Sequence, residues 1–371
     1  MNYGVYIHIP YCVQKCPYCD FYSIAYTQQS ALKYTQALLS AIESYRGKGL
    51  CADTVYFGGG TPNLIGSECI NSVLKKLREC LKITDDAEIT MEANPETLSR
   101  QNLSDFAKAG INRLSLGLQS ANPKELKSLG RRHTPEQAAH CVSEASAAGI
   151  KNISLDLMMG IEGQTQQSLL NSIDFCTDLG ATHISAYMLK IEPETPFYKK
   201  RALLNLPDDD QTALLYLSAC AELEKRGYAQ YEISNFAKDG KVSRHNLKYW
   251  QCGEYIGLGA AAHGFENGRR YYYPRSVKGF ITAPLKTICD GEGGSAEEAF
   301  MLGLRLCKGV DLAKLKTQFG ITFPDSFFSK LKQLKKAELL EKNGENIFLT
   351  PKGFLVSNSI ISELLRALDL I

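Results

Sequence analysis

Three features of the 371-residue sequence predict an α/β fold, a partial (β/α)6 barrel followed by a C-terminal, mostly helical, winged-helix-like domain. Up to about residue 190, short apolar segments alternate with amphipathic segments, as expected for parallel strands joined by right-handed helical crossovers. Six such units are too few for a closed barrel of eight strands. After about residue 294 the pattern changes to short helices and one hairpin.

The apolar segments define six expected strands, and amphipathic segments between them define five helices. The expected strands are residues 5–9, 54–57, 88–91, 113–118, 152–158 and 183–189. The expected helices are residues 30–45, 67–81, 99–109, 135–148 and 165–179. In parallel barrels the chemistry lies at the C-terminal ends of the strands, so functional motifs should directly follow these segments.

The length exceeds what one hydrophobic core usually supports, and the pattern changes divide the chain into three expected domains. The barrel covers residues 1–200, a β-rich extension containing HNLKYW covers 201–293, and the winged-helix-like domain covers 294–371. In the last domain we expect helices at 296–306, 311–319 and 324–335 and a hairpin around 346–349. Its lysine-rich run at 330–336 is typical of a solvated helix face, which favours a packing or partner-docking role over nucleic-acid binding.

Composition describes an ordinary globular chain, with 44% hydrophobic and 22% charged residues and a net charge of +2. This charge gives no reason to expect nucleic acid or an anionic membrane as a partner. No uninterrupted apolar run approaches the roughly 18 residues that span a bilayer, so we expect no stable membrane insertion. The first residues, MNYGVYIHIP, lack the features of a signal peptide, and twelve cysteines without one predict a reducing, cytoplasmic location.

The segment from residue 6 to 21, YIHIPYCVQKCPYCDF, carries the strongest chemical signal. Cys12, Cys16 and Cys19 follow the first expected strand with the spacing C-x-x-x-C-x-x-C. Three thiolates on one loop can each bind one iron of a [4Fe-4S] cluster. Phe21 stands two residues after the third cysteine, and the next cysteine is Cys51, so one iron is left open. An open iron that binds S-adenosylmethionine (SAM) is the signature of radical SAM chemistry.

Two other uses of clustered cysteines fit this segment less well. A structural zinc site typically takes four ligands arranged as two separated pairs, whereas this loop has three cysteines. A disulfide framework belongs to small secreted proteins, and this chain is long and has no secretory signal.

Polar and glycine-rich motifs follow several of the expected strands, as the barrel requires. FGGGTP at 57–62 follows the second strand, Glu92 the third and Gln119 the fourth. Glycines allow a close approach of the backbone to a ligand and expose its N–H groups. Asp156 lies within an otherwise apolar strand, and a buried carboxylate needs a cationic or hydrogen-bonding partner. Arg131 is a candidate for that partner and also for a ligand of the SAM carboxylate.

With these motifs the chain resembles the family of oxygen-independent coproporphyrinogen III oxidase-like radical SAM proteins, over nearly its whole length. The resemblance implies the open barrel, the [4Fe-4S] cluster and SAM. The segment GIEGQT departs from the family pattern, because Glu162 stands where proline is usual, which puts the shape of that loop in doubt. The positions that the resemblance assigns to SAM binding are Tyr6, Tyr18, Gly59, Gly60, Thr61, Glu92, Gln119, Arg131 and Asp156.

Within this family the chain is most similar to the haem-chaperone branch. The oxidases carry a fourth cysteine where Phe21 stands, and an N-terminal extension ahead of the cluster strand. HNLKYW, from His245 to Trp250, matches the motif H-N-x-x-Y-W that is typical of the chaperones. A neutral imidazole is a good axial ligand of haem iron, and Tyr249 and Trp250 can stack on a flat macrocycle. His263, in GAAAHG, is a second candidate.

The sequence therefore predicts a haem chaperone that binds a [4Fe-4S] cluster, SAM and haem and delivers haem to an acceptor protein. Its partners would be that acceptor and an electron donor, without nucleic acid. The alternative is an oxygen-independent radical SAM enzyme, such as a coproporphyrinogen III oxidase, in which a 5′-deoxyadenosyl radical abstracts hydrogen from a tetrapyrrole. A third hypothesis, a nucleic-acid-associated protein, is favoured by neither charge nor patterning.

Overall fold

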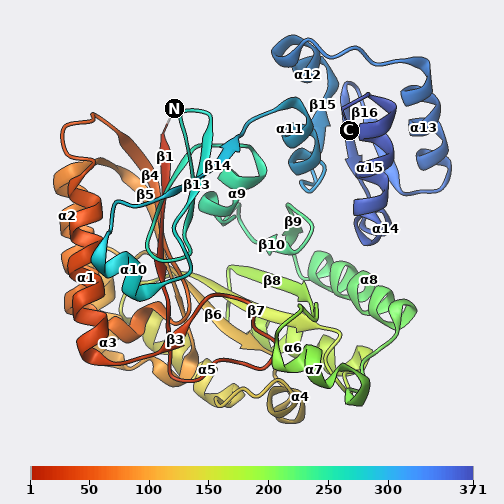
Figure 1. Cartoon of the computed structure of the whole chain (residues 1–371). Coiled ribbons are helices and arrows are strands. Elements are labelled where there is room, and N and C mark those ends of the chain that lie inside the picture. Colours follow the sequence, from red (N-terminus) through yellow and green to blue (C-terminus); the bar gives the residue numbers. More distant parts are fainter. Residues whose placement is uncertain (1, 371) are drawn as a thin grey trace.

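The computed structural model describes residues 2–370, and its largest element is a curved sheet of twelve strands (Figure 1). The order of neighbouring strands is β14-β13-β12-β11-β1-β4-β5-β6-β7-β8-β10-β9. All neighbours from β11 to β8 run parallel, as expected for a partial barrel. These strands are β11 (Tyr255–Leu258), β1 (Tyr3–Ile9), β4 (Cys51–Gly59), β5 (Lys82–Ala93), β6 (Arg113–Gln119), β7 (Asn152–Met159) and β8 (His183–Met188).

Helices cover the outer face of this sheet, and the predicted alternation of strands and helices is confirmed. In Figure 1, α1, α2 and α3 lie at the left of the sheet, and α6 and α8 lie at its right. Capping boxes start four of the helices, at Ser99, Thr134, Thr165 and Asp208. The bounds are α1 (Gln28–Glu43), α2 (Ser67–Cys80), α3 (Arg100–Ala109), α4 (Pro123–Ser128), α5 (Pro135–Ala147), α6 (Gln166–Asp178), α7 (Pro196–Lys200) and α8 (Asp209–Lys225).

Side chains alternate along each central strand between an apolar outer face and a polar inner face. On β1, Val5, Ile7 and Ile9 are fully buried in the core under the helices. Tyr6 and His8 point to the other face, where the Tyr6 hydroxyl lies 2.9 Å from His8 Nδ1. Because strands have a period of two, the same alternation brings polar residues of β4 to β8 to the inner face. The barrel interior is therefore polar, and its functional groups face one another across it.

Residues after the barrel extend the sheet at both of its edges. On one side, β10 (Asn235–Ala237) pairs antiparallel with β8 and with β9 (Ala229–Gln230). On the other side, β11 pairs parallel with β1 and leads into three antiparallel strands. The strand β11 thus adds a seventh parallel strand to the six that the sequence predicts. The three antiparallel strands that follow β11 are β12 (His263–Glu266), β13 (Arg269–Tyr272) and β14 (Ile288–Glu292).

Within the β-rich extension, between β10 and β11, HNLKYW forms the short helix α9 (Arg244–Trp250) rather than the strand that its β-rich surroundings predict. Ser243 caps this helix by accepting a hydrogen bond from the Asn246 amide. The Glu88 carboxylate accepts from the amides of Arg244, at 3.0 Å, and His245, at 3.1 Å. Three N–H groups that a helix start leaves unpaired are thereby satisfied, which stabilises a helix in a sequence rich in β-forming residues.

The C-terminal part has the helix–strand–helix–helix–strand–strand order of a winged helix, as predicted. Its three-stranded sheet has the order β15-β17-β16. Backbone hydrogen bonds join it to the extension, from Ile233 to Arg305 and from Cys307 to Tyr231, both 3.0 Å long. Its elements are α11 (Ala296–Gly303), β15 (Val310–Asp311), α12 (Leu312–Phe319), α13 (Asp325–Lys336), β16 (Leu340–Asn343), β17 (Asn346–Leu349), α14 (Pro351–Leu355) and α15 (Ser357–Ala367).

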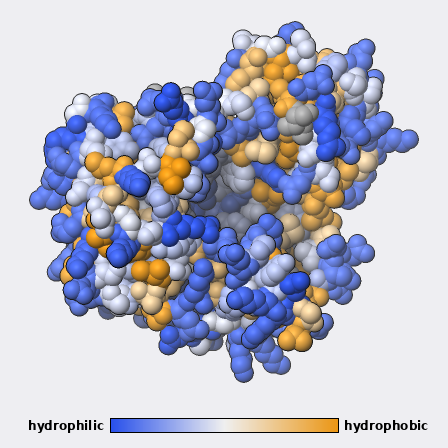
Figure 2. Space-filling view, viewed as in Figure 1, coloured by the Kyte–Doolittle hydropathy of each residue, from blue (hydrophilic) through white to orange (hydrophobic). Residues whose placement is uncertain are grey.

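The surface is hollowed between the barrel and this C-terminal part, as Figure 2 shows. The boundaries of the three domains, at residues 200 and 293, stay predictions. Among residues 2–370 the structure contains no helix with the length and apolar character needed to cross a bilayer.

Candidate cofactor site at the strand ends

The loop that carries the three cysteines lies against the C-terminal ends of the parallel strands. Its base is closed by the short parallel pair β2 (Tyr11–Cys12) and β3 (Ile24–Ala25). Inside the loop, the Cys19 amide donates to the Cys16 carbonyl at 3.1 Å. Cys12, Cys16 and Cys19 are free and partly exposed, so their thiols are accessible to a cofactor.

A chain of hydrogen bonds connects two of these thiols through residues that follow β4, β5 and α4. Thr61 donates to Cys12 Sγ at 3.8 Å and accepts from the Asn94 amide group at 3.0 Å. Arg131 donates to Asn94 Oδ1 at 2.6 Å and to Cys16 Sγ at 3.5 Å. Donors placed at sulfur favour the thiolate, which is the form that binds iron. Asn94 was not singled out in the sequence, although it lies in the same MEANP motif as Glu92.

The arrangement of the thiols bears on which metal group they can hold. In the part of the chain that the structure describes, no three histidine, cysteine or acidic side chains converge on one metal ion. A mononuclear zinc site requires such convergence, whereas each thiolate of a [4Fe-4S] cluster binds a different iron. The loop, with three separate thiols and hydrogen-bond donors at two of them, therefore fits a cluster better than a single ion.

The glycines of FGGGTP allow the cluster loop to pack closely on the sheet. Gly59 has a φ of 112°, and a Cβ atom there would lie 2.6 Å from the His8 ring. A Cβ atom on Gly60 would lie 2.5 Å from the Tyr11 carbonyl oxygen. Both distances are too short for any other residue without movement of the backbone, so these positions require glycine.

The expectation that the glycines of this motif expose free N–H groups to a ligand is wrong for Gly59 and Gly60. The Gly59 amide donates to the Glu92 carboxylate at 3.1 Å. The Gly60 amide donates to the Ile9 carbonyl at 2.9 Å, and the Thr61 amide donates to the Tyr11 carbonyl at 2.7 Å. Buried amides are normally paired, and here the nearest acceptors belong to the protein itself.

Two half-buried carboxyl groups, Glu92 and Asp156, face the barrel interior. Glu92 accepts a hydrogen bond from the Tyr56 hydroxyl at 2.7 Å, and Asp156 accepts one from Ser115 at 3.2 Å. Burial raises the pKa of Glu92 to about 7 and the pKa of Asp156 to about 6. Both groups are therefore poised to change charge near neutral pH, or to bind a cationic ligand such as the SAM amino group.

Arg131 does not pair with Asp156, contrary to one of the two predicted roles. Besides Asn94 and Cys16, its guanidinium donates to the Gly117 carbonyl at 2.6 Å. Its Nε atom is buried without a hydrogen-bond partner among the described residues. A buried donor without a partner is costly, so this atom fits an anionic ligand such as the carboxylate of SAM.

The cation that influences Asp156 most directly is Arg113, a residue that the sequence reasoning missed. Arg113 is only 2% exposed and, among residues 2–370, lies within 4.0 Å of no acidic group that could form an ion pair. Its charge partly offsets the rise in the pKa of Asp156 and of Glu92. Because Arg113 begins an apolar strand, the argument used for Asp156 could have identified it.

Three further predicted SAM positions lie around the same end of the barrel. Gln119 ends β6 with a φ of 70°, an unfavourable value for a residue other than glycine. Tyr18 lies in the cysteine loop, with its ring 6.1 Å from that of Phe197. Tyr6 lies on β1 and contacts His8. The predicted SAM positions thus lie on the cluster loop or on strands β1 and β4 to β7. The exceptions are Gly60 and Thr61, which directly follow β4, and Arg131, which lies in the loop after α4.

His245 is fully buried in the barrel interior, and its ring stacks on those of Tyr56 and Tyr6, with 5.1 Å and 6.4 Å between the centroids. Its Nδ1 lies 2.8 Å from the Thr54 hydroxyl and its Nε2 lies 2.7 Å from the Tyr249 hydroxyl. Burial lowers the pKa of His245 to about 3, so the ring is neutral. In this arrangement neither nitrogen can bind iron without losing a hydrogen bond, and a role as haem ligand stays a prediction.

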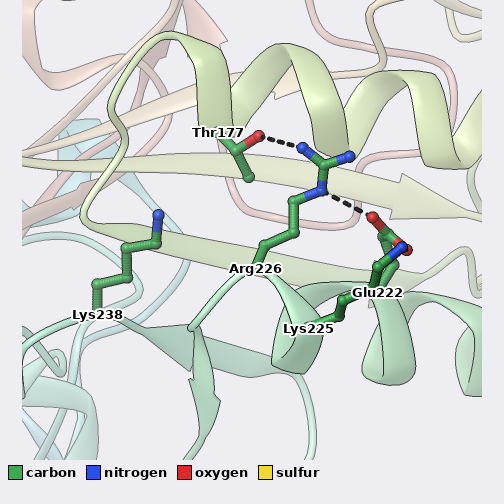
Figure 3. Close-up of a pocket in the computed structure, with 5 residues that line it drawn as sticks. All are labelled: Thr177, Glu222, Lys225, Arg226 and Lys238. Atoms are coloured by element: carbon green, nitrogen blue, oxygen red, sulfur yellow. Dashed lines mark hydrogen bonds and ion pairs between the residues drawn. The ribbon is translucent and has the colours of Figure 1, made fainter.

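A separate hollow between α6 and α8 lies outside this site (Figure 3). In Figure 3, Arg226 points to Thr177, at 3.3 Å, and to Glu222, at 2.7 Å. These groups lie at the C-terminal ends of the two helices, and therefore on the side of the barrel away from the cysteine loop. Lys225 and Arg226 both pair with Glu222, and the hollow is remote from the cysteine loop, so it is not part of the site.

Comparisons with known proteins agree with this geometry. Residues 6–176 match the model of the radical SAM superfamily, and residues 295–356 match the model of the HemN C-terminal domain. A heme chaperone HemW of Bacillus subtilis is 36% identical over 98% of this chain and its own full length. The chain belongs to the HemW family of radical SAM proteins. A second HemW, of Escherichia coli, is 40% identical over 75% of each chain.

The fold of this family member also matches that of a solved enzyme. The structure of coproporphyrinogen III oxidase (HemN) from Escherichia coli superposes with a TM-score of 0.81 at 21% identity. The superposition covers 98% of this chain and 90% of the oxidase. This likeness confirms the predicted fold class, including the partial barrel and the C-terminal part.

The raised pKa of Glu92 leads to a prediction about stability. Between the ordinary carboxyl pKa of about 4.3 and about 7, the folded state binds more protons at Glu92 than the unfolded state does. Glu92 therefore stabilises the fold less as the pH rises through this window. We expect the melting temperature of Glu92→Gln, relative to the parent, to rise by roughly a few degrees from pH 5 to pH 8.

Thermal unfolding of the cofactor-free protein, followed by circular dichroism at both pH values, measures this difference. Glu224→Gln, which changes an exposed carboxylate of α8, is the matched control and should keep a constant difference from the parent. An equally constant difference for Glu92→Gln would contradict the prediction.

Proposed function

We propose that this chain is a haem chaperone that binds a [4Fe-4S] cluster, SAM and haem, and passes haem to an acceptor protein. The observation that carries the proposal is the hydrogen-bonded chain from Cys12 through Thr61, Asn94 and Arg131 to Cys16. It links the cluster loop to the strand ends where SAM would bind. The name of the Bacillus subtilis and Escherichia coli relatives, heme chaperone, supports the choice of function.

The proposed roles follow from the geometry of the site. Cys12, Cys16 and Cys19 would bind three irons and leave the fourth open. Arg131 would hold the SAM carboxylate through its free Nε, and Glu92 would accept from the SAM amino group. A cluster with an open iron can supply an electron to bound SAM.

The oxidase alternative has one observation in its favour, the fold that this chain shares with HemN. At 21% identity that likeness concerns the fold alone. Phe21, which is 67% exposed, stands where the resemblance places an additional cysteine in the oxidases. We therefore propose the chaperone function first and test both functions on the same protein.

The cluster assignment predicts that the three cysteines together are necessary for iron binding. After anaerobic reconstitution, we expect about four irons and four sulfides per parent chain and none in the triple serine variant. Cys289→Ser, which removes an exposed cysteine elsewhere, should bind as much iron as the parent. A parent chain that binds zinc alone, or a triple variant that keeps its iron, would contradict the assignment.

The SAM assignment predicts that Arg131→Ala and Asp156→Asn weaken SAM binding. Loss of one hydrogen bond to a charged group weakens affinity about tenfold or more. Calorimetry on the reconstituted protein measures the affinity, and the iron content confirms that the cluster survives. The neighbouring exposed Arg132→Ala is the control and should bind SAM like the parent. Unchanged affinity in both site variants would show that the pocket is wrongly assigned.

The third prediction separates the chaperone from the oxidase. We expect the reconstituted protein to bind about one haem per chain and to leave coproporphyrinogen III unchanged in the presence of SAM and a reductant. Haem binding is measured by absorbance titration, and conversion by chromatography of the porphyrins. Decarboxylation at roughly one turnover per second or more, the range of ordinary enzymes, would favour the oxidase instead.

A further inference from the structure

A cavity of about 540 Å³ opens beside the cysteine loop, on the inner side of the sheet. Its walls come from β1, from the residues that directly follow Cys19, and from the β12–β13 hairpin. More than half of the residues that line it are aromatic. A cavity of this size lies within the range of roughly 300–1,000 Å³ that holds small-molecule ligands and cofactors. Of the aromatic residues in these walls, Tyr6 alone is also a predicted SAM position, and none of the three cluster cysteines lines the cavity.

Among the histidines of this cavity, His263 is the one available to a ligand. Its side chain is 62% exposed, and its ring stacks on Tyr272 with 5.4 Å between the centroids. Among the described residues, Asp290 is the only acidic group within 4.0 Å of the ring nitrogens, at 4.0 Å from Nδ1, and no hydrogen bond to the ring occurs. Desolvation by neighbouring residues lowers the pKa of His263, so the imidazole is neutral and able to bind a metal at neutral pH.

The two other histidines in or behind the cavity wall are already engaged. His8 Nδ1 lies 2.9 Å from the Tyr6 hydroxyl, and His8 Nε2 donates to the Tyr22 carbonyl at 3.0 Å. His245 lies behind the wall, where its Nε2 is 2.7 Å from the Tyr249 hydroxyl and its ring stacks on that of Tyr6. For either ring, binding iron would leave a buried hydroxyl or carbonyl group without its partner.

The other residues of the wall suit a flat aromatic ring that carries carboxylate groups. Phe21 is 67% exposed at the mouth of the cavity, and an exposed phenyl ring gains free energy when a ligand covers it. Arg275 is 66% exposed, and its guanidinium lies 4.0 Å from the carboxylate of Asp20. An exposed ion pair of this length is weak, so the guanidinium can turn to a ligand carboxylate. A porphyrin has this combination of an aromatic plane and carboxylate side chains.

We infer that this cavity is the haem site and that His263, rather than His245, is the axial ligand of the haem iron. Phe21 and the tyrosines cover the porphyrin plane, and Arg275 pairs with a propionate. His245 is then a positioning residue, which holds Tyr249 in the cavity wall. The inference rests on the proposed function, because it assumes that the chain binds haem.

The test is a titration of ferric haem into the reconstituted full chain, with the position of the Soret band and the affinity as readouts. We expect His263→Ala to shift the band and to weaken binding about tenfold or more. Added imidazole should restore the parental band, since a free imidazole can occupy the position of the lost ligand. His245→Ala should keep the parental band even if its affinity falls.

His140→Ala, which removes an exposed histidine of α5 outside the cavity, is the matched control and should behave like the parent. A parental band and affinity in His263→Ala would overturn the inference, as would a band shift that imidazole does not reverse. A band shift confined to His245→Ala would assign the ligand to that residue instead. Failure of the parent itself to bind haem would overturn the proposed function, which distinguishes the two results.

Discussion

The structure depends on hydrogen bonds among the polar side chains that the barrel turns inward. Because strands have a period of two, the sheet that buries Val5, Ile7 and Ile9 under the helices also places polar side chains in the interior. Closed barrels fill this space with apolar side chains. Here Tyr56 pairs with Glu92, and Ser115 with Asp156. These hydrogen bonds limit the cost of burial and leave titratable groups within reach of a ligand.

The cluster loop depends on the same constraint at the ends of the strands. Thr61, Asn94 and Arg131 each come from a different β/α unit. Arg131 donates a hydrogen bond to Asn94, and Asn94 donates one to Thr61. A displaced strand would break this chain and leave a buried donor unpaired. Neighbouring protein groups thus hold the loop against the strand ends, which agrees with the close packing required at Gly59 and Gly60. The site is built on strands rather than on a free loop.

Much of this fold could be predicted because local patterns encode it, whereas contacts between distant segments could not. Strand–helix alternation, the cysteine spacing and the polar residues after strands are all visible within short windows of sequence. The parallel pairing of β11 with β1 joins residues about 250 positions apart and has no local signal. Helix α9 was not predicted within the β-rich extension because Glu88, far away in sequence, stabilises its start. The prediction of free N–H groups in FGGGTP was also wrong because of distant residues. Glu92 and the carbonyls of Ile9 and Tyr11 accept hydrogen bonds from these N–H groups.

The HNLKYW motif can influence the cavity without contacting what binds there. His245 joins Thr54 of β4 to Tyr249, and Tyr249 lines the cavity, with its ring 4.6 Å from that of Tyr255. Loss of the imidazole would leave two buried hydroxyl groups unpaired, each at a cost of about 1–3 kcal/mol. The tyrosine would then be free to move, and the shape of the wall would change with it. A histidine can therefore be necessary for binding a ligand and still lie one residue behind the surface that the ligand meets.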